Sequence, residues 1–231
     1  SEPFTRLYFL RHGQTLTHKT YNFNGWTDVA LTEEGRRQLD EAAEALEGLE
    51  VDAVYSSDLE RAAYGGRRLA KLLGAPHEVR KEFREMNFGL CEGLVFNSIK
   101  QAYPELAAQI LDQKSQRLEF PQGETVQLFR ARVEQAFKQL LTERPFGSKV
   151  VLVSHSGVNR ALLGYFLKLS NCDLWTMEQD YACLNVADVY PNEVVRIRLV
   201  NGFLGPGGYY REGPGFNKLS LKRPLTDGEE S

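Results

Sequence analysis

Long hydrophobic runs are absent from this chain of 231 residues, and no apolar stretch approaches the ~20 residues that a membrane-spanning helix needs. The N-terminus also lacks a basic segment followed by an apolar one, so we expect no signal peptide. An excess of charge of one sign is missing too. The formal net charge of -3 gives no overall attraction to nucleic acid or to an anionic membrane. A positively charged pocket would therefore have to be local.

Cysteine is scarce, with three residues and no CxxC spacing. An odd number of scattered cysteines favours reduced thiols over a disulfide framework, so we expect a cytoplasmic protein. The four histidines, His12, His18, His77 and His155, show neither the H-x3-H nor the H-E-x-x-H spacing of common zinc sites. We therefore expect neither a metal nor another cofactor.

What the sequence does contain is an alternation of strand-like and helical segments. Strand-like runs lie at 4–10, 51–55, around 79, 150–153, 183–190 and 194–200, and helical patterns lie at 32–49, 57–73, 95–103, 104–111, 126–141 and 158–169. This alternation predicts an α/β fold, in which a mostly parallel sheet flanked by helices forms a single three-layer domain. No linker interrupts residues 1–200, so we assign them to one domain.

Residues 201–231 differ from the rest because glycine and proline are frequent there and the end is polar. One interpretation is a loosely held appendage. The aromatic residues of this tail could instead fasten it across the body or onto a second copy of the chain. A homodimer therefore stays open as an alternative.

The helical pattern at 57–73 begins with a strong start signal. Ser57 and Glu60 have the spacing of a capping box, which would place Arg61 in the first helical turn. Basic residues are disfavoured at the positive N-terminal end of a helix, although a solvated surface arginine is an ordinary alternative. An arginine at this point indicates a nearby anion.

Two histidines follow two separate strand-like runs. Arg11-His12-Gly13 comes directly after the run 4–10, and Ser154-His155-Ser156-Gly157 comes directly after 150–153. The carboxyl ends of parallel strands are where ligands bind in open α/β sheets. Guanidinium groups match phosphate oxygens, and a neutral imidazole can attack phosphorus. The pattern predicts a site for phosphoryl chemistry, with His12 as the candidate nucleophile.

Five motifs in this order resemble those of the histidine phosphatase superfamily, which has the phosphoglycerate-mutase-like fold. They are RHGQT at 11–15, NGWTD at 24–28 with LTEEG at 31–35, SSDLERA at 56–62, Glu85 with FG at 88–89 and EG at 92–93, and SHSG at 154–157. The resemblance implies that His12 is phosphorylated and that Arg11, Arg61 and His155 grip the transferred phosphoryl group. It further implies that Glu85 protonates the leaving oxygen and later activates water.

The rim of the site departs from the family pattern. His18 stands where the family usually has asparagine, and an imidazole makes a phosphate contact dependent on pH. We expect Asn24 beside it, with Ser156 close to the phosphate. Backbone N–H groups near Gly25 and after His155 are expected to add anion contacts. The segment 91–122 is expected to roof the pocket.

Within this superfamily the sequence is most similar to small-molecule phosphatases, and among them to α-ribazole phosphatases of cobalamin synthesis. We expect a small phosphorylated metabolite as substrate. A phosphoglycerate mutase is the first alternative, but such mutases carry a longer insertion with paired arginines, whereas residues 94–122 contain only Arg117. A catalytically idle phosphate-binding protein is the second alternative. Such proteins usually lose the nucleophile or the acid, and both His12 and Glu85 are present here.

Overall fold

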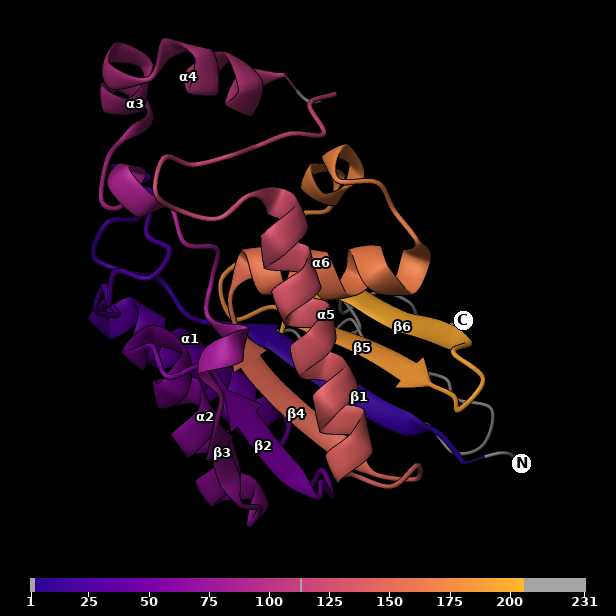
Figure 1. Ribbon diagram of the computed structural model, residues 1–231. Coiled ribbons are helices and arrows are strands. Elements are labelled where there is room, and N and C mark those ends of the chain that lie inside the picture. The colour runs from indigo at the N-terminus through magenta and orange to yellow at the C-terminus, as the bar shows by residue number, and fades with distance from the viewer. Residues whose placement is uncertain (1–2, 113, 206–231) are drawn as a thin grey trace, which may run out of the picture.

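The structure is a computed structural model that describes residues 3–112 and 114–205 (Figure 1). Its centre is a six-stranded sheet with the order β3-β2-β4-β1-β5-β6. The strands are β1 (Thr5–Arg11), β2 (Ala53–Ser56), β3 (His77–Val79), β4 (Lys149–Ser154), β5 (Leu184–Val189) and β6 (Val195–Gly202). The first four strands pair in parallel, and β5 and β6 are antiparallel. The predicted α/β fold with a mostly parallel sheet is confirmed.

Helices cover both faces of this sheet. They are α1 (Glu33–Ala45), α2 (Glu60–Leu73), α3 (Phe96–Ala102), α4 (Pro104–Leu111), α5 (Val126–Glu143) and α6 (Ser156–Leu167). Side chains of β1 alternate between two cores: Leu7 and Phe9 pack in the cluster with α5 and α6, and Tyr8 and Leu10 pack in the cluster with α1 and α2. Figure 1 shows these two layers on opposite faces, with α3 and α4 beyond one end of the sheet. The three-layer prediction is confirmed.

The central strands bring distant motifs to one edge of the sheet. Strands β1 and β4 are neighbours, with Arg11 in register with Ser154, and the His12 N–H donates to the Ser154 carbonyl at 3.0 Å. Strand β2 lies on the other side of β4. As a result, the segments that follow β1, β2 and β4 all leave the sheet at the same end.

The predicted capping box of α2 is wrong. The helix begins at Glu60 with Leu59 as its N-cap, and no side chain of the N-cap residue accepts a hydrogen bond. Asp28, from a distant loop, accepts the Glu60 N–H at 2.9 Å instead. The Ser57 hydroxyl pairs with His155 at 2.8 Å and is not used by the helix. Arg61 nevertheless lies in the first turn, as predicted.

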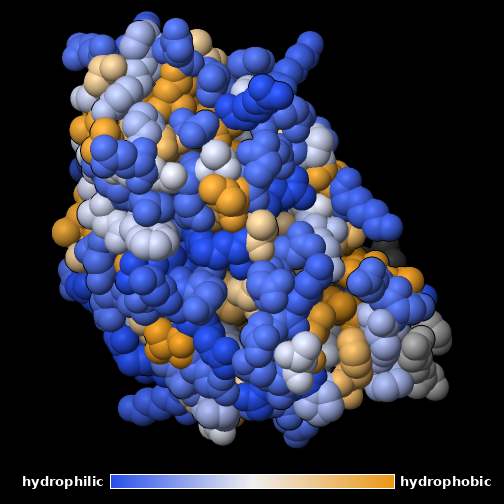
Figure 2. All heavy atoms as spheres, viewed as in Figure 1, coloured by the Kyte–Doolittle hydropathy of each residue, from blue (hydrophilic) through white to orange (hydrophobic). Residues whose placement is uncertain are grey.

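The C-terminal part of the chain is described only as far as residue 205. Strand β6 runs to Gly202, two residues past the predicted domain boundary at 200. Residues 206–231 lie outside the described residues, so the role of the tail and the homodimer stay predictions. In the part of the chain that is described, no helix combines the length and hydrophobicity needed to cross a membrane. Hydrophilic residues dominate the face in Figure 2, with hydrophobic ones scattered among them.

Candidate active site

A pocket of about 430 Å³ lies at the edge of the sheet where β1 ends. It is lined by Arg11, His12, Thr15, Thr17, His18, Tyr21, Asn22, Phe23, Asn24, Arg61, Glu85, Phe88, Ser156, Arg160 and Tyr181. Seven of the nine predicted site residues are among these. Gly25 and His155 are not, but each contacts a lining residue: Gly25 accepts from Arg61, and His155 lies beside His12.

His12 is buried and its ring orientation is fixed. Its Nδ1 lies 2.7 Å from the Gly13 carbonyl oxygen, which can only accept, so Nδ1 carries the hydrogen and Nε2 keeps its lone pair. Burial lowers the pKa of His12 well below its usual range, and the charges of Arg11 and Arg61 lower it further. The imidazole is therefore neutral near pH 7, which is the form that can act as a nucleophile.

Two arginines supply positive charge beside this ring. Arg61 is almost fully buried, and its terminal nitrogens donate to the carbonyls of Asn24, Gly25 and Thr27 at 3.1, 2.7 and 2.7 Å. Three of its five N–H groups are thus engaged in holding the loop, and two remain for an anion. Arg11 donates to the Gln179 carbonyl at 2.7 Å, and its guanidinium stacks 4.1 Å from the centre of the Tyr181 ring.

His155 is completely buried next to His12, with 5.4 Å between the ring centroids. Its Nε2 pairs with the Ser57 hydroxyl, and its Nδ1 has no hydrogen-bond partner. Burial lowers the pKa of His155 well below its usual range, and the neighbouring Arg61 adds to the effect. A second neutral imidazole therefore lies directly beside the candidate nucleophile.

Glu85 is the acidic residue of the pocket. One carboxylate oxygen accepts the Met86 N–H at 3.0 Å, and the other accepts the Gly157 N–H, also at 3.0 Å. Gly157 belongs to the first turn of α6, where the positive end of the helix dipole favours a carboxylate. Glu85 is thus oriented by backbone groups on both of its oxygens.

The rim residues His18 and Asn24 are held in place by their own loop. The His18 Nδ1 lies 2.9 Å from the Thr15 carbonyl, so its Nε2 is the atom left for a ligand. The Asn24 amide donates to the Thr17 hydroxyl at 2.5 Å. Ser156, at the start of α6, also lines the pocket.

The predicted backbone anion contacts are wrong for two N–H groups. The Gly25 N–H donates to Glu92 at 3.1 Å, and the Gly157 N–H donates to Glu85. The carboxylates of Glu92 and Glu85, both from the segment 85–92, take these donors. Glu92 collects further N–H donors from Trp26, Thr27 and Phe88.

The prediction that the segment 91–122 roofs the pocket is also wrong. None of the lining residues comes from 91–122, whereas seven come from the loop 15–24 and Phe88 lines the pocket as well. Within 91–122, α4 and Arg117 line a separate pocket. A helical pattern in the sequence gives no information about the direction in which a helical pair leaves the sheet.

Eight of the fifteen lining residues were not predicted as site residues, among them Arg160 and Tyr181. Arg160 follows Ser156 by four residues in α6, a spacing that brings both to the same helix face, so this residue could have been found. Its Nε donates to the Met177 carbonyl at 2.8 Å. Tyr181 comes from an irregular segment before β5 and carried no local signal.

Among the described residues, no group of three or more histidine, cysteine, aspartate or glutamate side chains is arranged to hold a metal ion. The positive charge of the pocket comes from arginine side chains.

Comparison with known proteins identifies the family. The family model of the histidine phosphatase superfamily (branch 1) matches residues 7–202. The chain belongs to this superfamily. The bifunctional protein Rv2228c of Mycobacterium tuberculosis is 32% identical over 85% of this chain, which spans only 54% of that protein's length. The protein named "Probable phosphoglycerate mutase GpmB" of Yersinia pestis is 28% identical, with 73% of this chain and 82% of that protein covered.

Solved structures with the same fold include several phosphatases. The α-ribazole phosphatase of Shigella flexneri superposes with a TM-score of 0.77 at 26% identity, covering 85% of this chain and 96% of that one. The mycobacterial glucosyl-3-phosphoglycerate phosphatase Rv2419c superposes with the same TM-score of 0.77 at 27% identity, covering 85% and 98%. Equal similarity to enzymes named for different substrates means that the fold alone does not select a substrate for this chain.

Proposed function

We propose that this chain is a phosphatase that hydrolyses a small phosphomonoester through a phosphohistidine intermediate at His12, without a metal ion. The observation that carries the proposal is a pair of buried, unpartnered nitrogens, Arg11 Nε and His155 Nδ1, beside the neutral imidazole of His12. Within the described residues only one other buried side-chain atom, Thr5 Oγ1, lacks a partner. Buried polar groups are nearly always hydrogen-bonded. With the Ser57 hydroxyl donating to Nε2, the Nδ1 of neutral His155 carries a hydrogen, as Arg11 Nε does, so both nitrogens lack an acceptor such as a phosphoryl oxygen.

In the first step the phosphoryl group lies against Arg11, Arg61 and His155. The His12 Nε2 lone pair attacks phosphorus, the N–P bond forms, and the P–O ester bond breaks. Glu85 gives a proton to the departing oxygen and becomes a carboxylate. The alcohol then leaves.

In the second step Glu85, now a carboxylate, takes a proton from water. The water oxygen attacks phosphorus, the N–P bond breaks, and inorganic phosphate leaves. His12 returns to its neutral form and Glu85 to its protonated form, so the cycle closes.

The leaving group meets the rest of the pocket lining, in which Tyr21, Phe88, Arg160 and Tyr181 provide aromatic surface and one cation. We propose α-ribazole 5′-phosphate as the first substrate to test, and a cytoplasmic location with it. This choice is supported by the sequence resemblance and by the α-ribazole phosphatase among the similar structures. Sugar phosphates and phosphorylated sugar acids belong in the same panel, because Rv2419c is equally similar.

The mutase alternative is less well supported. Arg117, the single arginine of 94–122, lines a different pocket from the one that holds His12. A mutase would also need a bisphosphorylated primer to become active.

A phosphate-release assay tests the proposal. We expect the purified chain to release phosphate from 4-nitrophenyl phosphate without primer and in the presence of a chelator, and His12→Gln to abolish release. Activity retained by His12→Gln would overturn the phosphohistidine mechanism. Dependence on a primer would favour the mutase, and the absence of any turnover with intact phosphate binding would favour an idle binding protein.

A further inference from the structure

The candidate acid lies on a segment that has no regular secondary structure. Residues 84–88 belong to neither a helix nor a strand, and lie between the single turns Lys81–Phe83 and Gly89–Cys91. In a helix or a strand, the repeating backbone hydrogen bonds would hold a catalytic side chain in position. Here the backbone of Glu85 must be held by side chains from other segments.

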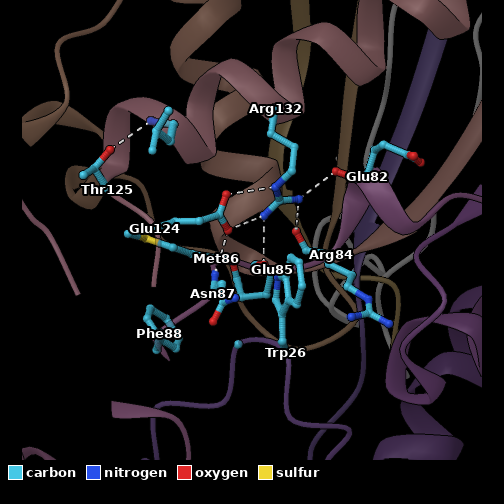
Figure 3. A network of polar contacts seen from close by, with 12 residues as sticks. Trp26, Glu82, Arg84, Glu85, Met86, Asn87, Phe88, Glu124, Thr125 and Arg132 are labelled. Carbon is cyan, nitrogen blue, oxygen red and sulfur yellow. Dashed lines mark hydrogen bonds and ion pairs between the residues drawn. The ribbon is translucent and has the colours of Figure 1, made fainter. Parts of the chain in front are cut away.

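Arg132, on α5, donates to three backbone carbonyls in and next to this segment. One terminal nitrogen donates to the Glu82 carbonyl at 2.8 Å and to the Arg84 carbonyl at 2.9 Å. The other donates to the Glu85 carbonyl at 3.1 Å (Figure 3). The planar guanidinium of Arg132 thus binds three backbone carbonyls within residues 82–85.

The remaining N–H groups of Arg132 bind Glu124 in a two-point ion pair, at 3.0 and 2.7 Å. With three carbonyls and two carboxylate contacts, all five N–H groups of this guanidinium are used. Glu124 also accepts the Asn87 N–H at 2.8 Å, so it holds the same segment from its other end. Arg132 does not line the active-site pocket, and its donors are already occupied.

Trp26 supplies a second donor to the same carbonyl. Its indole N–H donates to the Glu85 carbonyl oxygen at 2.9 Å. The Arg84 and Arg132 guanidiniums lie 4.9 and 5.9 Å from the centre of its ring, which fixes the indole by cation–π contacts. Figure 3 shows Trp26 and Arg132 approaching Glu85 from opposite sides.

We propose that Arg132 and Trp26 are positioning residues for Glu85. They fix both acceptor positions of its carbonyl, so that its carboxylate stays between the Met86 and Gly157 N–H groups at the pocket. This inference rests on the proposed function, in which Glu85 protonates the leaving oxygen. Loss of either donor leaves the phosphate-binding residues in place and displaces the acid.

The test compares two substrates that differ in their need for an acid. The 4-nitrophenolate ion leaves without protonation, whereas the alkoxide of glycerol 2-phosphate must be protonated. We measure kcat/KM for both, because this parameter reports the step in which the leaving group departs. We expect Arg132→Met to lower the ratio of alkyl to aryl kcat/KM by about 10-fold, and Glu85→Gln to lower it by about 100-fold, within the usual range for general acid catalysis.

Arg80→Met is the matched control. Arg80 is also paired with carboxylates, those of Glu78 and Glu143, but it lies outside the site, so the ratio should not change. If Arg132→Met does not fold, Trp26→Phe decides, since it removes one N–H donor and keeps an aromatic ring. An unchanged ratio in these variants, while Glu85→Gln lowers it, would overturn the positioning role and leave the proposed function intact. An unchanged ratio in Glu85→Gln itself would overturn the role of Glu85 in the proposed function.

Discussion

At the scale of single residues, the feature that matters is that two histidines are buried without a carboxylate partner. His12 and His155 lie side by side under two arginines, and the described structure gives neither imidazole a carboxylate partner. Both pKa values are lowered, chiefly by burial. The pocket therefore combines the lone pair of a neutral imidazole, at His12 Nε2, with positive charge, an arrangement that suits an anionic electrophile.

We expect His12 to stay neutral at pH 6.5, where an unperturbed histidine is about half protonated. Because the folded-state pKa is lowered, protonation begins only below that pH, and a bound phosphate or vanadate anion should raise the midpoint again. Titration of the ring proton by NMR, assigned with His12→Gln, measures both. A midpoint at or above 6.5 in the anion-free protein would contradict this account.

The lowered pKa of His12 also makes the fold less stable as pH falls below 6.5, since the histidine of the unfolded chain takes up its proton first.

At the scale of elements, helix N-termini serve the site in two ways. The first turn of α6 orients Glu85 through the Gly157 N–H, and α2 presents Arg61 from its own first turn. Neither N-terminus depends on its N-cap side chain. Carboxylates from distant loops, Glu85 and Asp28, accept the N–H groups at these helix ends instead. These hydrogen bonds connect the loops to the helices.

Gly157→Ala tests the contact between α6 and the acid. A Cβ at this position would stand 2.1 Å from Glu85 Oε1, so the carboxylate would have to move. Alanine favours a helix by about 1 kcal/mol over glycine, so the fold should persist. We expect kcat/KM for an alkyl phosphate to fall by about 100-fold with little change in phosphate affinity. Unchanged turnover would show that the position of this carboxylate does not matter.

Asp28→Ala tests the cap of α2. Removal of the acceptor should lower the free energy of unfolding by about 1 kcal/mol, measured by urea denaturation. Asp28→Asn keeps an acceptor oxygen and should cost less. Equal losses in the two variants would mean that the carboxylate charge, and not the hydrogen bond, stabilises this end.

The elements of the structure follow the sequence pattern more closely than the contacts between them do. Over residues 3–112 and 114–205, the periodicity predicts every strand and α-helix to within a few residues, and α4 has the predicted bounds. The strand ends also predict correctly that the motifs around His12, Arg61 and His155 meet. The capping box fails because the same local pattern at Ser57 serves a tertiary contact to His155. The support of Glu85 by Arg132 could not be predicted, since the two are joined only through an irregular segment.

At the scale of the whole molecule, the antiparallel half of the sheet is joined to the parallel half by buried charge. Asp188 of β5 is fully buried and accepts from Arg6 of β1 at 2.6 and 2.8 Å, and from Arg198 of β6 at 2.7 Å. Three neighbouring strands are thus linked on the side of β1 away from β4. This network stabilises the sheet at a distance from the pocket.

Asp188→Ala should therefore lower the free energy of unfolding by about 3–5 kcal/mol, because it removes the buried carboxylate that Arg6 and Arg198 share. Denaturation by urea measures the loss. Glu34→Ala, which breaks the exposed pair with Arg37, is the control and should leave the midpoint nearly unchanged. Similar midpoints for the two variants would mean that the buried network contributes little to the stability of the sheet.

Trapping the covalent intermediate tests the central claim most directly. The wild-type chain is mixed with a radiolabelled phosphomonoester, quenched in alkali, in which phosphohistidine survives, and digested for mass spectrometry. We predict one phosphorylated peptide, labelled at His12, and no label in His12→Gln. Rapid hydrolysis by the wild-type chain with no label, or with the label on another residue, would contradict the account.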